Sequence, residues 1–118
     1  MIKGIGIDIV GTDNFRKTGN DDDFISQILT VSEIAEFSRR QSGADIAGLF
    51  AIKESVLKAL GCGLSRGFYW HDIEIDEEYS IQLTGRLREL ADKLTISKIH
   101  CSHSHSENYT AALVLLEG

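Results

Sequence analysis

Hydrophobic and polar residues alternate at the start of the chain, where glycines and isoleucines follow one another. Residues 2–10 end in Val10, and this pattern predicts a short, well-buried first strand. Gly4 and Gly6 within it indicate that another part of the backbone approaches closely. They do not form a GxGxxG fingerprint, because Ile9 stands at the third glycine position. A dinucleotide-binding fold is therefore not favoured.

Periodic apolar positions then predict helices through the middle of the chain. The acidic run 21–23 places negative charge at the start of a helix over 24–29, where the helix dipole favours it. Residues 30–33 fit a capping box, with Thr30 and Glu33 in its reciprocal positions, at the start of the next helix. The longest helix is expected over 44–60, because its apolar residues recur at i, i+3 and i+4.

The second half of the chain is predicted to consist mainly of strands. Two alternating segments, at 70–76 and 80–83, suggest a hairpin, and an amphipathic helix follows over 85–94. Two further strands are expected at 96–104 and 109–116, and the last, nearly all apolar, is expected to be central. A short helix is also expected within 13–19. The order of elements indicates an α+β fold rather than a strict βαβ alternation.

The composition is that of an ordinary globular protein, expected to form a single domain over residues 1–118. Apolar residues make up 42% and charged residues 25% of the chain. A net charge of −6 argues against a protein that works by neutralising nucleic-acid phosphates. No stretch approaches the ~20 apolar residues that cross a bilayer, and Asp8 falls where a signal peptide would continue its apolar core. We therefore expect a cytoplasmic protein with neither a membrane nor a nucleic-acid partner.

Two acids and a lysine are candidates for phosphate chemistry. Asp8 near the exit of the first strand and Glu54 in the long helix form a pair of carboxylates suited to one Mg²⁺ with waters and substrate phosphates. Asp8 is also consistent with a buried structural acid at a turn, which is the more common role of a lone acid at a strand end. Lys58 lies four residues after Glu54, which is also the spacing of a solvated ion pair. The glycine-rich segment 61–67 follows, either as a phosphate-binding loop or as an ordinary helix cap and loop.

A histidine-rich segment at 100–105 leaves a different chemistry open. His103 and His105 share one face if this segment is a strand, so they permit a zinc site with Cys101. A zinc-dependent hydrolase would need a further ligand from elsewhere in the chain, and the candidates are Asp8, Glu54 and His71. A hydrogen-bonding histidine at the mouth of a site is the simpler interpretation. Cys62 has no evident histidine relay that would make it a nucleophile.

Four segments together carry a resemblance to a known family. Gly4-Ile5-Gly6-Ile7-Asp8-Ile9-Val10 is similar to an opening motif, and 29–33 is similar to an L-T-x-x-E motif. Residues 50–63 are similar to the signature F-A-x-K-E-A-x-x-K-A-x-G-x-G, and 100–112 to a C-terminal strand pair. In these motifs the chain resembles the holo-[acyl-carrier-protein] synthases, which are small 4′-phosphopantetheinyl transferases. The resemblance covers nearly the whole chain and implies one long helix packed on a small, mainly antiparallel sheet.

The resemblance also implies an activity and a set of site residues. The family transfers 4′-phosphopantetheine from coenzyme A to a serine of an apo acyl or peptidyl carrier protein and releases 3′,5′-ADP. By resemblance, Asp8 and Glu54 hold Mg²⁺, and Lys58 contacts the coenzyme A phosphates. The loop from Gly61 wraps the nucleotide, with Gly63 and Ser65 among its binding residues, and His105 helps to close the site. Glu54 is the candidate general base for the serine hydroxyl, and His105 is its rival.

The expected partners are coenzyme A, an acidic carrier protein and two further copies of the chain, because members of this family form trimers with sites between neighbours. Because many of the acids lie in two clusters, at 21–23 and 72–78, a locally basic docking face is expected despite the negative net charge. The cations expected to be free for such patches are Arg16 with Lys17, Arg39 with Arg40, and Lys53, Lys58 and Arg66. Three residues, Gly11, Asn14 and Leu49, stand where the family usually has charged side chains. They keep open the alternative of a homologue that binds coenzyme A without transferring anything.

Overall fold

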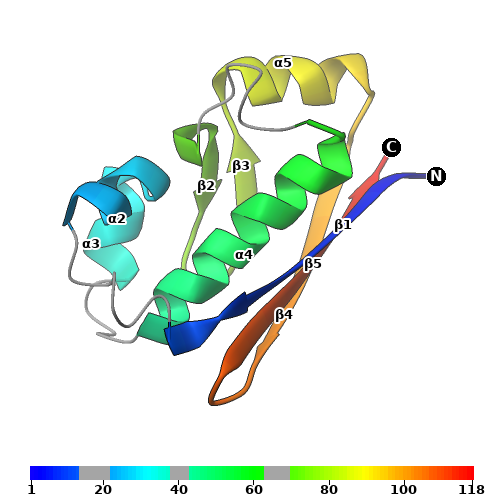
Figure 1. The fold of residues 1–118 in the computed structure, drawn as a ribbon. Helices are drawn as coiled ribbons and strands as arrows, with labels where there is room; N and C mark the ends of the chain where they lie inside the picture. Colours follow the sequence, from blue (N-terminus) through cyan, green and yellow to red (C-terminus); the bar gives the residue numbers. More distant parts are fainter. Residues whose placement is uncertain (14–21, 38–42, 63–69) are drawn as a thin grey trace.

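The computed structural model describes residues 1–13, 22–37, 43–62 and 70–118 (Figure 1). One long helix lies across one face of a three-stranded antiparallel sheet, which confirms the α+β fold expected from the sequence. The strands follow one another across the sheet in the order β1, β5, β4. Their bounds, and those of the long helix α4, are β1 Ile2–Gly11, β4 Lys98–His105, β5 Tyr109–Glu117 and α4 Gly43–Leu60. The last strand is central, as its apolar sequence predicts.

The helix α4 packs directly on β1 because two glycines leave room for its backbone. A Cβ atom on Gly4 would collide with the carbonyl oxygen of Ala59, and one on Gly6 with that of Ser55. This confirms the close backbone approach predicted from the two glycines. The contact places the C-terminal half of α4 beside β1, so that the candidate acids of the two elements lie near each other.

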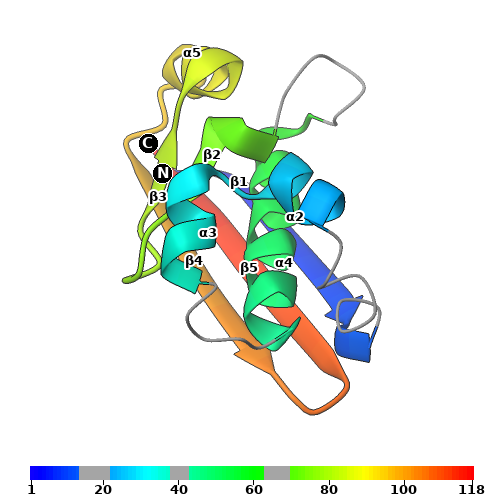
Figure 2. The same ribbon diagram turned by 90° about the vertical axis from the view of Figure 1, so that its left-hand side faces the viewer.

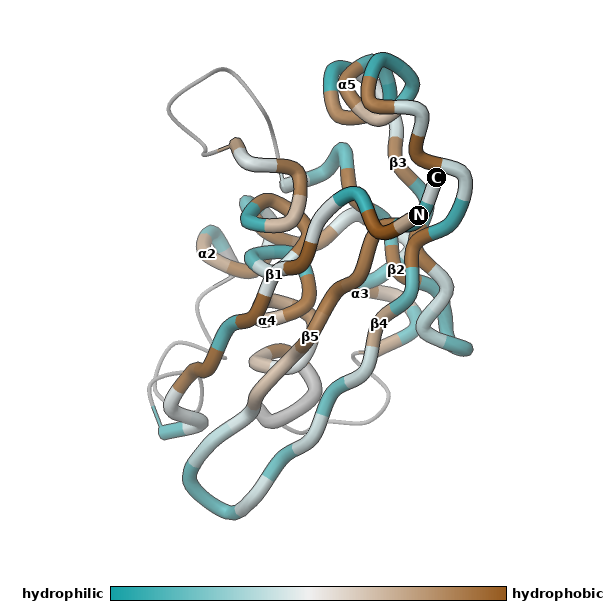
Figure 3. The backbone as a smooth tube through the Cα atoms, turned by 90° about the vertical axis from the view of Figure 1, so that its right-hand side faces the viewer, coloured by the Kyte–Doolittle hydropathy of each residue, from teal (hydrophilic) through white to brown (hydrophobic). Residues whose placement is uncertain are grey.

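On the opposite face of the sheet, β1 and β5 expose apolar side chains in the single chain. Ile5, Ile7 and Ile9 of β1 are all exposed, and Leu113 of β5, paired with Ile7, is exposed as well. Figure 3 shows the hydrophobic residues along β5 and at alternate positions of β1. The prediction of a well-buried first strand is therefore wrong for this face, because the alternation that turns the glycines toward α4 turns the isoleucines outward.

Smaller elements cover the side of α4 that faces away from β1 (Figure 2). They are the helices α2 Asp22–Ile28, α3 Val31–Phe37 and α5 Gly85–Lys93, the 3₁₀ helix η3 Trp70–Asp72, and the strands β2 Ile73–Ile75 and β3 Ile81–Leu83. The strand predicted over 70–76 is corrected at its start, because its first three residues form η3. There the backbone carbonyl of Asp72 accepts a hydrogen bond from Thr84 N, which links η3 to the start of α5.

The core lies between α4 and the sheet, with α3, β2 and α5 closing it. Its fully buried members include Leu49, Ile52, Val56, Ile73 and Leu87. The helix expected within 13–19 lies almost wholly outside the described residues. Among the helices that the structure does describe, none has the length and apolar character required to cross a membrane.

Candidate functional site

The long helix and the first strand bring Asp8, Glu54 and Lys58 together. Lys58 Nζ donates to Asp8 Oδ1 at 2.9 Å and to the carbonyl oxygen of Ile7 at 3.0 Å. The lysine side chain is 51% exposed and the aspartate only 14% exposed, so the pair lies at the edge of the interior. The interpretation of Lys58 as part of a solvated pair with Glu54 is corrected, since the carboxylate that it contacts belongs to the neighbouring strand.

The two carboxylate oxygens of Asp8 differ in their hydrogen bonding. Its Oδ2 is buried and has no hydrogen-bond partner, although Oδ1 is held by Lys58. A buried carboxylate oxygen without a donor is unfavourable unless a cation or a donor binds there. This atom therefore fits the role of a ligand for a hard cation such as Mg²⁺.

Glu54 faces the same region, and its surroundings there shift its pKa. Partial burial is the largest cause that raises the pKa of Glu54, and the negative charge of Asp8 raises it further. Lys58 acts in the opposite direction and lowers it. A divalent cation would relieve the repulsion between the Glu54 and Asp8 carboxylates, so the donor set fits Mg²⁺.

The end of α4 leads into the glycine-rich segment. Gly61 has φ +74°, and its N–H donates to Lys58 O at 3.1 Å, while Cys62 N donates to Leu57 O at 3.0 Å. This is the left-handed glycine cap predicted for Gly61, and it ends α4 one turn beyond Lys58. Gly63 and Ser65, the other two residues predicted in this loop, lie outside the described residues.

His105 is not brought to the acids within one chain. His105 of β4 pairs with Thr110 of β5, and Thr110 pairs in turn with Val10 of β1. His105 therefore lies two strands away from β1, the strand of Asp8, at a distance of roughly 10 Å. Its side chain is exposed at the end of β4. Its predicted role in closing the site stays a prediction.

The zinc hypothesis finds no support in the geometry. Across the described residues, no three side chains of His, Cys, Asp or Glu are grouped so as to hold a metal ion. His103 instead stacks on Tyr79, with ring centroids 4.3 Å apart. His71 Nε2 lies 2.6 Å from the carbonyl oxygen of Ser26, so it is occupied elsewhere.

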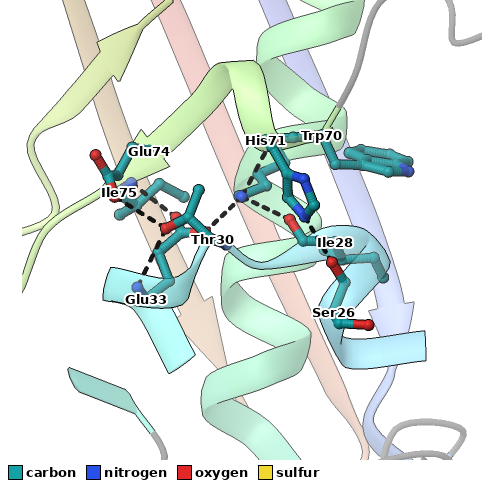
Figure 4. Close-up of polar contacts among 9 residues, drawn as sticks. Ser26, Ile28, Thr30, Glu33, Trp70, His71, Glu74 and Ile75 are labelled. Atoms are coloured by element: carbon teal, nitrogen blue, oxygen red, sulfur yellow. Dashed lines mark hydrogen bonds and ion pairs between the residues drawn. The ribbon is translucent and has the colours of Figure 1, made fainter. Parts of the chain in front are cut away.

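The expectation that Lys53 is free to form a basic patch is wrong, because its Nζ donates three hydrogen bonds inside the protein, to acceptors on Ile28, Glu33 and Trp70 (Figure 4). Lys53 is fully buried and pairs with the equally buried Glu33 at 2.6 Å. Burial lowers the pKa of Lys53, and the attraction of Glu33 opposes that effect. The available signal was a lysine in the apolar stripe of α4 together with a glutamate in a capping box.

The capping box itself is confirmed. Thr30 N donates to Glu33 Oε1 at 2.8 Å, and Glu33 N donates to Thr30 Oγ1 at 3.2 Å. Glu33 Oε2 also accepts the backbone N–H of Ile75 at 2.8 Å, and Thr30 Oγ1 donates to Glu74. One glutamate thus caps α3, pairs with α4 and holds Ile75, the last residue of β2.

Comparison with known proteins agrees with these motifs. A family model described as the 4′-phosphopantetheinyl transferase superfamily matches residues 4–114. The chain is 37% identical over 124 residues to a holo-[acyl-carrier-protein] synthase of Vibrio cholerae, and the match covers 99% of this chain and 98% of that one.

Solved structures give the same likeness. An acyl carrier protein synthase of Plasmodium yoelii with ADP bound superposes with a TM-score of 0.84 and 30% identity, covering 98% of this chain and 95% of the other. A holo-[acyl-carrier-protein] synthase of Helicobacter pylori in complex with coenzyme A has a TM-score of 0.79 and 30% identity, covering 96% and 99%. Sequence and fold are therefore similar over nearly the entire length of these proteins.

Proposed function

Because this chain belongs to the holo-[acyl-carrier-protein] synthase family of 4′-phosphopantetheinyl transferases, we propose that it transfers 4′-phosphopantetheine from coenzyme A to a serine of an apo acyl or peptidyl carrier protein. The observation that carries the proposal is the triad of Asp8, Glu54 and Lys58 at the contact of β1 with α4. A relative with coenzyme A bound and nearly the same fold supports coenzyme A as the donor.

We propose Asp8 and Glu54 as the ligands of Mg²⁺. The orphaned Asp8 Oδ2 and the raised pKa of Glu54 support this assignment. When bound, Mg²⁺ supplies charge neutralisation at the pyrophosphate of coenzyme A. Lys58 already holds Asp8 Oδ1, and its exposed ammonium group is placed to contact a phosphate oxygen as well.

The transfer requires one bond to form and one to break. The serine oxygen bonds to the phosphorus that carries the pantetheine arm, the bond from that phosphorus to the oxygen of 3′,5′-ADP breaks, and the serine proton passes to a base. Glu54 is the proposed base, because it lies beside Asp8 and Lys58 within one chain. His105 is the rival, and it could reach the acids only from another copy of the chain or after a rearrangement.

The loop that follows α4 is proposed to bind the nucleotide through Gly61, Gly63 and Ser65. Gly61 is positioned for this by the cap at the end of α4. Leu49 is part of the hydrophobic core and presents no cation, so the phosphate grip is assigned to Lys58.

The proposed activity is tested by incubating the purified protein with coenzyme A, Mg²⁺ and a panel of apo carrier proteins. Intact-mass measurement should show an addition of about 340 Da, the mass of the transferred group, on at least one carrier. The alternative, a homologue that only binds coenzyme A, predicts calorimetric binding of coenzyme A with no addition to any carrier. That outcome would overturn the proposed activity.

We further propose that three copies of the chain meet through the exposed face of the sheet. The supporting observation is the row of exposed apolar side chains on β1 and β5, among them Ile5, Ile7, Ile9 and Leu113. A contiguous apolar face of this kind is typical of a protein–protein interface. It also places a neighbouring chain beside β1, the strand that carries Asp8.

Replacing Ile7 with aspartate is expected to dissociate the oligomer, because Ile7 is 65% exposed at the middle of this face and a carboxylate there would be buried without a partner. Size-exclusion chromatography with light scattering measures the mass. The matched control is Val31→Asp, since Val31 is 85% exposed at the start of α3 and should leave the mass unchanged. An unsubstituted protein that runs as a monomer would contradict the proposal.

A further inference from the structure

All three N–H donors of the Lys53 ammonium group are used inside the protein. Its Nζ donates to Ile28 O at 2.7 Å, to Glu33 Oε1 at 2.6 Å and to Trp70 O at 3.2 Å. An ammonium group has three donors, so none remains for a substrate. The side chain is also 0% exposed, which excludes a direct contact with coenzyme A or a carrier in this arrangement.

The two carbonyl groups that accept hydrogen bonds from Lys53 belong to two other elements, α2 and η3. Ile28 is the last residue of α2, and Trp70 is the first residue of η3 (Figure 4). The ring of Trp70 also packs against Phe50, one turn before Lys53, with centroids 5.3 Å apart. The helix α4 therefore contacts η3 in two ways, through the packing of Phe50 on the ring of Trp70 and through the hydrogen bond from Lys53 to Trp70 O.

A second contact joins α2 to η3 directly. His71 Nε2 lies 2.6 Å from the carbonyl oxygen of Ser26, and since a carbonyl oxygen only accepts, the imidazole donates. The C-terminal carbonyl groups of a helix need such donors. Lys53 and His71 supply them for α2, so the end of this helix is fixed to both α4 and η3.

Lys53 and Glu54 are neighbours in sequence and project from α4 about 100° apart, so they face different parts of the protein. Lys53 points to α2, α3 and η3, whereas Glu54 is influenced by Asp8 of β1. Gly6 sets the distance of α4 from β1 through the close approach of Ser55. The buried lysine sets the rotation of the same helix from a different side.

Stability alone does not call for an ion pair at this place. Apolar side chains of similar volume often replace a buried ion pair without loss of stability. They would, however, leave the carbonyl groups of Ile28 and Trp70 without a donor. The arrangement therefore serves to fix α2 and η3 against α4 in one geometry.

We propose that Lys53 is a positioning residue for the transfer reaction, which holds α2 and η3 in register with the face of α4 that carries Glu54 and Lys58. This inference rests on the proposed function. His71 assists it from η3. Neither residue touches the reacting atoms.

The test compares three variants at a temperature where each is folded. Lys53→Met removes all three donated bonds, and His71→Ala removes one bond from an exposed side chain and is expected to fold normally. Leu116→Ala is the matched control, because it destabilises the buried core on β5 outside this cluster. The measurements are the melting temperature, kcat and KM for both substrates, and the calorimetric affinity for coenzyme A.

We expect kcat/KM to fall at least about tenfold in Lys53→Met, and by less in His71→Ala, because small displacements of positioning elements are costly to catalysis. Leu116→Ala should lose melting temperature and keep the kcat and KM of the unsubstituted protein. Wild-type kinetics in both Lys53→Met and His71→Ala would overturn the inference, as would an equal loss in Leu116→Ala. If Lys53→Met does not fold, the comparison of His71→Ala with Leu116→Ala tests the inference.

Failure of the proposed function gives a different result. An unsubstituted protein that transfers nothing to any carrier overturns the proposed activity. The affinity for coenzyme A then still separates the variants, and equal affinities in Lys53→Met, His71→Ala and the unsubstituted protein would overturn the positioning role.

Discussion

Replacing Glu54 with glutamine is expected to lower the rate of transfer by about 10³-fold or more while the chain stays folded. Glutamine has nearly the same shape, but it cannot accept the serine proton and lacks the charge that would hold Mg²⁺ beside Asp8. The measurement is the intact-mass assay with an excess of coenzyme A and carrier protein. Full activity in this variant would remove Glu54 from the mechanism.

The same variant should be more stable than the unsubstituted protein in metal-free buffer near neutral pH. Burial and Asp8 raise the pKa of Glu54 in the folded chain. A raised pKa contributes stability that is fully present below the ordinary pKa of glutamate and is lost as the pH rises through the folded value. The melting temperature of Glu54→Gln should therefore exceed that of the unsubstituted protein increasingly from acidic to neutral pH.

The control for this comparison is Glu89→Gln, on the exposed surface of α5. A surface substitution of this kind usually changes stability by no more than about 0.5 kcal/mol. It should leave both the rate of transfer and the pH dependence of melting as they are. A melting curve for Glu54→Gln that follows the unsubstituted protein at every pH would contradict the electrostatic account of the site.

Replacing Gly6 with alanine is expected to destabilise the protein by about 2–3 kcal/mol or more and to impair transfer in the fraction that remains folded. The added Cβ would overlap the carbonyl oxygen of Ser55 and crowd Ala59 N, and both are backbone atoms of α4 that cannot rotate away. The helix must then move off β1. That movement carries Glu54 and Lys58 away from Asp8.

Gly48→Ala is the matched control, because it adds the same methyl group to a buried glycine of α4 itself. There the nearest atom to the new Cβ would be Thr110 Cγ2 at 3.9 Å, an ordinary contact. Alanine is favoured over glycine in a helix interior by up to about 1 kcal/mol, so this variant should be stabilised. Denaturant unfolding measures both variants, and equal stabilities would contradict the steric account of the contact between α4 and β1.

Most of the secondary structure could be predicted because it depends on neighbours in the chain. The long helix, its glycine cap and the capping box of Thr30 and Glu33 all arise from side chains within one or two turns of each other. The start of the predicted hairpin could not be placed, because alternation over 70–76 does not reveal that Trp70 O is bound by Lys53. A tertiary hydrogen bond thus acts on the segment that forms η3.

The candidate site was predictable in its members but not in its contacts. Asp8, Glu54 and Lys58 were identified from motifs, and the spacing of four residues suggested that Glu54 pairs with Lys58. The structure pairs Lys58 with Asp8 instead, because the two glycines of β1 bring that strand within reach of the helix. His105 was assigned to the same site, and the sheet order places it two strands away.

The sequence by itself determined the family, the candidate acids and the two glycines that admit α4, since each is written in local motifs and side-chain size. Only the tertiary structure decided which atoms meet: the orphaned Asp8 Oδ2, the raised pKa of Glu54, and the burial of Lys53 against Glu33. These properties depend on distance, burial and the supply of donors among residues far apart in the chain. A lysine in the apolar stripe of a helix gives the same sequence pattern whether its side chain reaches solvent or, as here, holds two other elements in place.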